Sequence, residues 1–269
     1  MRVPYSYILV VAFFVSGVGS GVGQEFTLAD DVGPGGADVA SAATHVPPAA
    51  TSPSRLAPEA ALMVYLRHAQ LQAETLASYS DITTVDAELP DSAQRGRLRL
   101  RRVFAAPRSL TFQALDFAGD SFIKTNVIAR LLQSEVDHVQ KGEGPQIAIT
   151  DANYKFTFKG MEDFDGRMLY AYAVKPHKKR PGLFKGRIFI DPADGSLTRA
   201  EGTLVKSPSI FVKKIRFVQD YNEVSGFSLP IHIHSVAETR IAGRAIVDVV
   251  HANYQAHAFS DTQTTAVAR

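Results

Sequence analysis

Three histidines near the C-terminus have the type and spacing that could bind a metal ion. His232 and His234 are two residues apart, so both point to the same side if residues 227–240 form a β-strand. If Ala242-Gly243 is a two-residue hairpin turn, His251 on the next strand lies opposite His234. Such a cluster could bind zinc or copper and support a metal-dependent enzyme. The alternative is that His232 and His234 belong to a solvated face, because the pairing depends on the length of the loop.

Two other groups of residues have the composition of catalytic sites, but local structure also explains them. Gly119-Asp120-Ser121 is similar to the nucleophile block of GDS-type esterases, yet Asp and Ser are also common caps at the start of a helix. Glu162, Asp163 and Asp165 precede Gly166, which is typical of a turn. The chain has no cysteine, which excludes thiol catalysis, disulfides and Cys-ligated metals. We therefore expect no catalytic residue and no cofactor.

Basic residues form two local groups, one on a predicted strand and one in a predicted loop. Either group could face an anionic partner or lipid headgroups, and the alternative for both is a solvated surface. The net charge of the whole chain is only +2, so the sequence gives no reason to expect a nucleic-acid partner. The headgroup or partner candidates are Arg97, Arg99, Arg101, Lys178, Lys179 and Arg180.

From residue 153 to residue 257 the sequence reads as a series of β-strands joined by short turns. Polar and apolar residues alternate, as at Tyr154, Phe156 and Phe158, and turn residues follow at 162–166 and 191–195. This pattern is typical of half-buried antiparallel strands. We expect strands within residues 154–158, 168–174, 184–190, 197–205, 210–221, 227–240 and 244–255.

The preceding hundred or so residues are expected to supply two helices and two or three further strands. Pro58 can begin a helix in which apolar residues such as Tyr65 and Ala69 recur at three- and four-residue steps. A second, broader amphipathic helix is predicted from Asp120-Ser121 to Gly142. The strands are expected at residues 79–89, 96–104 and 109–117.

Both ends of the chain are expected to lie outside the folded domain. Residues 1–23 have a basic start, a short apolar run and a small-residue end, which is typical of a cleavable secretory signal, with an uncleaved anchor as the alternative. Residues 24–55 are rich in Ala, Gly and Pro and predict a disordered spacer, and residues 259–269 predict a frayed tail. We expect a periplasmic or extracellular monomer without a lipid anchor, because there is no cysteine to carry one.

The folded domain is predicted to span residues 56–258 and to be α+β, mainly β. So many consecutive antiparallel strands require one strongly curved sheet, open like a half-barrel, with two or more helices plugging its concave side. The space between the helices and the sheet is either an apolar cavity or a dry core. The sequence leaves both possibilities open.

The order of these elements, together with several short segments, resembles the LolA/LolB-like superfamily of periplasmic outer-membrane lipoprotein-sorting proteins. The resemblance covers residues 58–257. The segments that carry it are Leu76-Ala77-Ser78-Tyr79, residues 186–191, Ala200-Glu201-Gly202, Tyr221, residues 226–230 and residues 240–243.

This resemblance implies an incomplete antiparallel barrel, capped by helices, whose apolar cavity holds acyl chains. It implies a non-enzymatic carrier or chaperone that binds a lipid or an acylated lipoprotein and exchanges it with an envelope membrane-protein donor or acceptor. The alternative is an envelope sensor or interaction module of the same fold without cargo. The residues expected to line the cavity, which would equally form an ordinary core, are Leu98, Leu100, Phe112, Phe156, Phe158, Tyr170, Tyr172 and Phe217.

Overall fold

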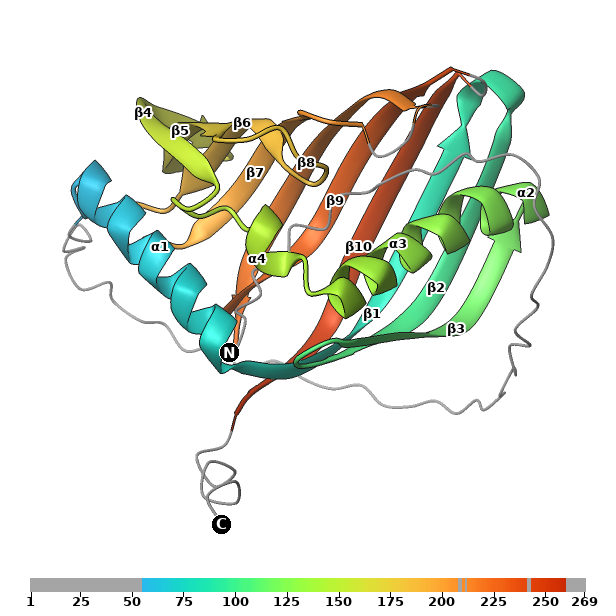
Figure 1. The fold of residues 1–269 in the computed structure, drawn as a ribbon, viewed down its shortest axis with the longest axis horizontal. Helices are drawn as coiled ribbons and strands as arrows, with labels where there is room; N and C mark the ends of the chain where they lie inside the picture. The colour runs from blue at the N-terminus through green and yellow to red at the C-terminus, as the bar shows by residue number, and fades with distance from the viewer. Residues whose placement is uncertain (1–54, 208–209, 211, 241–242, 260–269) are drawn as a thin grey trace, which may run out of the picture.

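A computed structural model describes residues 55–207, 210, 212–240 and 243–259 of the chain. The predicted signal sequence, nearly all of the predicted spacer and residues 260–269 of the predicted tail lie outside the described residues. Four α-helical segments, of which α4 (Gly144–Ile147) is a single turn before β4, and a ten-stranded sheet make up most of the described part (Figure 1). The division of the chain into segments stays a prediction.

One antiparallel sheet forms the frame of the molecule. Its strands are ordered β3-β2-β1-β10-β9-β8-β7-β6-β5-β4, so the chain runs as two meanders that meet where β1 pairs with β10. The edges of the sheet, β3 and β4, do not pair with each other, and the barrel stays open. The strands are β1 (Leu76–Leu89), β2 (Gln94–Ala105), β3 (Ser109–Gly119), β4 (Tyr154–Phe164), β5 (Arg167–Pro176), β6 (Phe184–Ile190), β7 (Leu197–Leu204), β8 (Val212–Val224), β9 (Phe227–Thr239) and β10 (Arg244–Ala258).

Alternating burial and tight turns explain why these segments form strands. Along β2 every second residue is buried, which is the two-residue period of a strand with one face against the core. Asp165-Gly166 and Ser225-Gly226 have positive φ angles of 52°, 81°, 54° and 81°, and each pair connects two adjacent strands. Two successive residues with positive φ are typical of the two-residue hairpin turn whose twist matches that of its strands.

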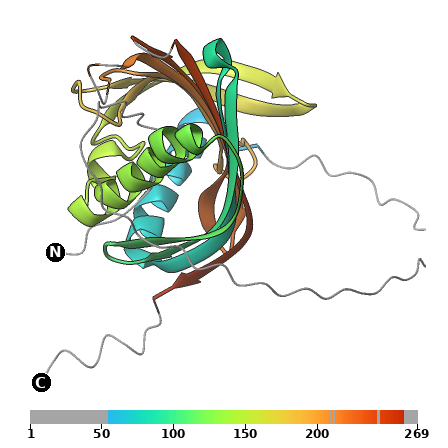
Figure 2. The same ribbon diagram turned by 90° about the vertical axis from the view of Figure 1, so that its right-hand side faces the viewer.

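Helices cover the concave side of the sheet. Helix α1 (Pro58–Thr75) begins at the predicted proline and lies over the strands of the second meander, while α3 (Ala129–Lys141) crosses the first (Figure 1). Figure 2 shows both helices on the inner side of the curved sheet. The predicted fold class, a strongly curved and incomplete antiparallel barrel plugged by helices, is therefore confirmed.

The second predicted helix is present, but its beginning differs in detail. It starts as α2 (Ser121–Ile123), continues through a π-helical turn (Lys124–Ile128) into α3, and ends at Gly142 with a φ of 66°. Asp120 occupies the N-cap position as expected, but its side chain makes no cap hydrogen bond. Its Oδ2 instead accepts the backbone N–H of Arg95 at 2.9 Å, which fastens the start of the helix to the start of β2.

Candidate functional site

The three histidines do not share one patch of the sheet. Thr239 N–H donates to the carbonyl oxygen of Gly243 at 2.7 Å, so the hairpin loop is longer than the two residues expected. The register is thereby shifted by an odd number of residues, and His234 pairs with Asp248 instead of His251. An odd shift exchanges the faces of a strand, so the predicted cluster is wrong. Among the described residues, no group of three or more possible ligands could hold a metal ion.

His232 and His234 lie on the outer face of the sheet, as the alternative interpretation held. The Nδ1 atom of His234 is 2.7 Å from Oδ1 of Asp248, and His232 lies 3.5 Å from the same oxygen. Asp220 is 3.6 Å from His232 and also accepts a hydrogen bond from Arg199 at 2.6 Å. Both imidazole side chains are about two-fifths exposed, so this row of polar contacts is screened by solvent and contributes little to stability.

Buried polar groups on the inner face join β1, β2 and β10 around Arg102, which is 3% exposed. Its Nε donates to Oδ2 of Asp81 at 2.8 Å, and its Nη2 donates to Oη of Tyr254 at 2.7 Å. Tyr254 donates in turn to the carbonyl oxygen of Pro230 at 2.7 Å. The guanidinium carbon also lies 5.0 Å from the centre of the Tyr79 ring. These contacts partner a buried cation with a carboxylate and an aromatic face.

His251 belongs to this buried cluster. Thr83 Oγ1 donates to Oδ1 of Asp81 at 2.5 Å, and His251 Nδ1 lies 3.0 Å from the Thr83 hydroxyl and 3.2 Å from the same Asp81 oxygen. Because the carboxylate can only accept, this network assigns the proton of the imidazole to Nδ1. The other ring nitrogen, Nε2, is buried and has no hydrogen-bond partner among the described residues.

Burial and charge set the protonation of this cluster. Burial lowers the pKa of His251 to about 4, assisted by the charge of Arg102, so the imidazole is neutral at pH 7. Burial alone would raise the pKa of Asp81, but Arg102 and the hydrogen bonds from His251 and Thr83 lower it to about 2. Burial raises the pKa of Glu135, on α3, to about 8, and Arg102 offsets this only in part. One full ion pair, Arg102 with Asp81, therefore exists at pH 7, beside a largely protonated Glu135.

The sequence analysis missed this cluster, although the alternation contains the signal for it. Arg102 occupies the same face of β2 as Leu98, Leu100 and Phe104, whereas Arg97, Arg99 and Arg101 occupy the other. On β1, Val85, Ala87 and Leu89 are buried, and the same parity places Asp81 and Thr83 inside. Arg102 and Asp81 each share a face of their strand with buried apolar residues, and this alternation predicts a buried ion pair.

The residues expected to line a cavity fall into two groups on the inner face. Leu98, Leu100 and Phe112 belong to β2 and β3, near the helical segment after β3. The other five belong to strands of the second meander: Phe156, Phe158, Tyr170, Tyr172 and Phe217. All except Phe158 are buried in, or packed against, one apolar cluster. Their role in ligand binding stays a prediction.

Phe158 is the exposed member of this set. Its side chain is 41% exposed on the edge strand β4, and its ring centre lies 5.6 Å from that of Tyr170 and 5.4 Å from that of Tyr172. The two tyrosines donate hydrogen bonds to the carbonyl oxygens of Leu56 and Pro58, at 2.7 and 2.6 Å. An aromatic rim therefore holds the beginning of α1 at one end of the concave face.

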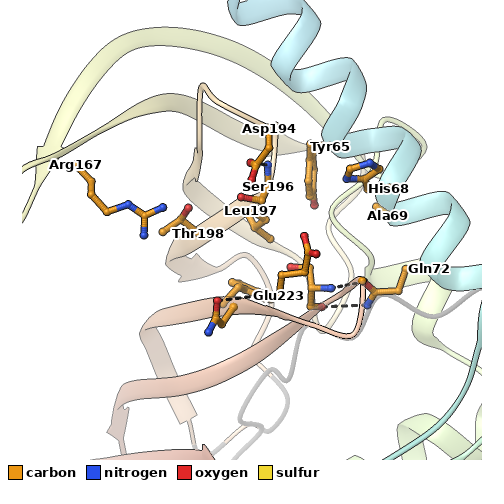
Figure 3. A pocket seen from close by; sticks show the side chains of 15 residues that line it. Tyr65, His68, Ala69, Gln72, Arg167, Asp194, Ser196, Leu197, Thr198 and Glu223 are labelled. Atoms are coloured by element: carbon orange, nitrogen blue, oxygen red, sulfur yellow. Dashed lines mark hydrogen bonds between the residues drawn. The ribbon is translucent and has the colours of Figure 1, made fainter. Parts of the chain in front are cut away.

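Polar contacts also hold the middle and the end of α1. Tyr65 Oη donates to the carbonyl oxygen of Ile149 at 2.8 Å. Gln72 makes a pair of bonds with the backbone of Ser228: its Nε2 donates to the carbonyl oxygen at 3.0 Å, and its Oε1 accepts the N–H at 2.8 Å (Figure 3). Between these contacts the helix presents the small residues Ala61 and Ala69 to the sheet. Helix α1 is thus a cover attached by side-chain hydrogen bonds and by apolar contacts of Leu62, Tyr65 and Leu66 with the core cluster.

The two basic groups lie on distant strands. The three arginines are exposed on the outer face of β2, where Arg97 Nε donates to Oδ1 of Asp86 at 2.6 Å. Lys178, Lys179 and Arg180 are exposed between β5 and β6. In the sheet order β2 is six places from β6 and seven places from β5, so the groups do not form one basic surface.

The acidic turn at residues 162–166 has a structural role. Asp163 Oδ1 accepts the N–H of Gly166 at 2.7 Å, as expected for a turn residue. Glu162 accepts a hydrogen bond from Arg187 at 2.5 Å, and Arg187 also donates to Glu201 at 2.6 Å. The carboxylates are therefore engaged in the turn and in ion pairs across neighbouring strands.

Comparisons with known proteins give likenesses in structure only. No family model matches the sequence, and no curated protein matches it. A solved DUF1329 family protein from Desulfovibrio piger is 10% identical, with 73% of this chain and 92% of that chain covered and a TM-score of 0.38. A putative outer membrane lipoprotein-sorting protein domain from Vibrio parahaemolyticus is 8% identical, with 76% and 97% covered and a TM-score of 0.39. A LolA superfamily protein from Nitrosomonas europaea is 10% identical, with 70% and 90% covered and a TM-score of 0.33.

At these TM-scores the likenesses add no argument about function. Within the described part of the chain, no helix is long and apolar enough to cross a membrane. The open, curved antiparallel sheet with helices on its concave side is the LolA-like architecture that the sequence resemblance implied.

Proposed function

We propose that this protein is a non-enzymatic carrier of the cell envelope that holds an acyl chain of a lipid or lipoprotein on the concave face of its sheet. The acyl chain lies beneath helix α1, which acts as a replaceable cover. The observation that carries the proposal is the way α1 is attached to an apolar and aromatic face. Side-chain hydrogen bonds hold the helix there, together with the small residues Ala61 and Ala69 and with apolar contacts of Leu62, Tyr65 and Leu66 to the core cluster.

The burial of an acyl chain is worth more free energy than the hydrogen bonds that hold helix α1. Each of the hydrogen bonds from Tyr65, Gln72, Tyr170 and Tyr172 contributes about 1 kcal/mol net, because water replaces it when the helix lifts. The set is therefore worth about 5 kcal/mol. An acyl chain gains about 0.8 kcal/mol for each methylene removed from water, so a chain of about 14 methylenes gains about 11 kcal/mol. The acyl chain therefore outweighs the polar attachments of the helix, but it must also replace the apolar contacts that Leu62, Tyr65 and Leu66 make with the core cluster.

The exposed aromatic rim is the proposed entrance. Phe158 stands beside Tyr170 and Tyr172 at the edge of the sheet, where the hydrogen bonds to Leu56 and Pro58 hold the beginning of α1. An acyl chain that first contacts Phe158 reaches the interior when those hydrogen bonds open. The predicted signal sequence in residues 1–23 supports the envelope as the location of this exchange.

Native mass spectrometry of the mature protein tests the proposal. We expect a bound mass that organic extraction releases as phospholipid or acylated peptide, either after purification or after incubation with phospholipid. Phe158→Glu should reduce this uptake strongly, because it introduces a charge at the entrance. Val250→Glu is the matched control, since Val250 is also exposed (45%) but belongs to the outer face of β10.

A wild-type protein that stays bare after incubation would refute the carrier function and favour an interaction module without cargo. Equal uptake by folded Phe158→Glu and Val250→Glu variants would remove the rim as the entrance. Circular dichroism of each variant establishes that it is folded before uptake is compared.

A further inference from the structure

A polar pocket lies beside helix α1. Its walls are the second half of α1, the turn between β6 and β7, and the turn between β8 and β9 (Figure 3). The pocket has a volume of about 200 Å³. Gly195 allows the first turn to approach the helix closely, because a Cβ there would collide with Val64.

Two hydroxyl groups that line this pocket have no partner. Tyr221 is only 9% exposed, and its Oη makes no hydrogen bond within the described residues. The Oγ of Ser228 is also buried and unpartnered there, although the backbone of Ser228 is held by Gln72. A buried hydroxyl without a partner is unfavourable, and native proteins rarely keep one without a reason. Both hydroxyls are covered in the free protein, so they can donate to a bound molecule only when the side chains around them shift.

Carboxylates give the same pocket a negative balance. Glu223 lies among the lining side chains in Figure 3, and its carboxylate makes no ion pair with any described residue. Within the described part of the chain, the carboxylate of Asp194 accepts a hydrogen bond only from the backbone N–H of Ser196, at 2.8 Å. The guanidinium of Arg167, which also lines the pocket, is already paired with Asp191 at 2.6 Å. Two carboxylates therefore remain without a cation beside two free hydroxyls.

We propose that this pocket binds a primary ammonium group carried next to hydroxyl or phosphate oxygens, the chemistry of a 2-amino alcohol. The ammonium donates to the carboxylate of Glu223, and the neighbouring oxygens accept hydrogen bonds from Tyr221 Oη and Ser228 Oγ. The ring of Tyr65, which also lines the pocket, offers a face that attracts a cation. Charge and hydrogen bonding thus select the amine over a neutral polyol of the same size.

Two sources supply this chemistry, a soluble amino sugar and the ethanolamine headgroup of a phospholipid. The inference does not depend on acyl-chain transport. Glucosamine has no acyl chain, so its binding is independent of uptake at the aromatic rim. If the protein takes up lipid but does not discriminate between headgroups, the proposed function stands and the amine-binding site is refuted.

Titration calorimetry of the mature protein tests the site with four probes. The amines are glucosamine and dihexanoyl phosphatidylethanolamine, and the comparators are glucose and dihexanoyl phosphatidylcholine, which lacks N–H donors. We expect saturable binding of at least one amine and binding about tenfold weaker or less for its comparator. The amine that binds identifies the source, and binding of both leaves the pocket open to either.

Two conservative variants locate the binding. Glu223→Gln should weaken amine binding about tenfold or more, because it removes the charge of the carboxylate to which the ammonium donates. Tyr221→Phe should weaken it about threefold to tenfold through the loss of one hydrogen bond. Glu88→Gln, which removes an exposed carboxylate of β1, is the control and should bind like the wild type.

Tyr221→Phe also separates a binding role from a structural one. Its hydroxyl has no hydrogen-bond partner among the residues that the structure describes, so the Tm of the free protein should stay the same or rise, while the affinity for the amine falls. Failure of both amines to bind saturably would overturn the inference. So would glucose binding as tightly as glucosamine, or unchanged amine affinity in either Glu223→Gln or Tyr221→Phe.

Discussion

Glu135 makes stability depend on pH in a direction that can be calculated. Its side chain lies on α3, 9% exposed, and its Oε2 is 3.9 Å from Nη1 of Arg102, too far for a hydrogen bond. Burial raises its pKa from 4.5 to about 8, despite the neighbouring charge of Arg102. The folded protein therefore holds a proton on Glu135 that the unfolded chain releases above its ordinary pKa.

A raised carboxyl pKa stabilises the fold at low pH. Between pH 4.5 and about pH 8 the folded state binds one more proton at Glu135 than the unfolded state, so stability falls as pH rises. The slope is about 1.4 kcal/mol per pH unit, which amounts to about 3 kcal/mol at pH 7. The amide side chain of the Glu135→Gln variant has nearly the shape of the protonated carboxyl group, but it does not titrate. We expect it to match the wild type near pH 4.5 and to exceed it by at most about 3 kcal/mol at pH 7.

Urea unfolding followed by circular dichroism measures this difference, since the chain has no tryptophan for fluorescence. The free energies of unfolding of wild type, Glu135→Gln and the exposed control Glu88→Gln are compared from pH 5 to pH 8. The reasoning is refuted if the difference between Glu135→Gln and the wild type does not change with pH. If the stability of Glu88→Gln relative to the wild type also rises with pH, the pH dependence comes from general surface charge and not from Glu135.

Further predictions concern the ion pair beneath α3 and the sheet. Arg102→Leu should destabilise the protein by about 3–5 kcal/mol, because it leaves Asp81 buried without its cation, and urea unfolding at pH 7 measures the loss. The pKa of Asp81 is lowered from 3.8 to about 2. Its contribution to the free energy of unfolding is therefore present above pH 4 and disappears between about pH 4 and pH 2. Asp81→Asn should flatten this acid limb of the plot of unfolding free energy against pH. Gly186→Ala should prevent normal pairing of β6 with β7, because a Cβ there would collide with the carbonyl oxygen of Glu201. Thermal unfolding of the variant should accordingly be less cooperative than that of the wild type. A wild-type Tm in this last variant would contradict the close approach.

The elements of the fold were largely predictable because each depends on local patterns. The proline at position 58, the alternation along the strands and the glycine at position 142 each mark an element within its own few residues. The curvature of the sheet followed from the number of consecutive strands. These features require no knowledge of distant neighbours.

The functional surroundings depended on distant pairing, and the sequence analysis could not supply it. His251 faces Thr83, from the other end of the chain, and a loop only slightly longer than expected moved it away from His234. The polar pocket is also assembled from a helix and two turns that are far apart in sequence. A buried hydroxyl without a partner among the described residues, such as that of Tyr221, can be recognised only from the three-dimensional positions of its neighbours.

The pairing of β1 with β10 also governs the order in which the protein can fold. Val85 pairs with Val249, so the first strand of the chain must wait for the last before the two meanders become one sheet. Such long-range pairing slows folding, and until it forms, β1 and β9 are edges open to other chains. A chain emerging N-terminus first therefore passes through an aggregation-prone intermediate that ends only when residues 244–258 arrive. Truncation at residue 243 should accordingly split the sheet at its centre, whereas loss of β3 would merely shorten one edge.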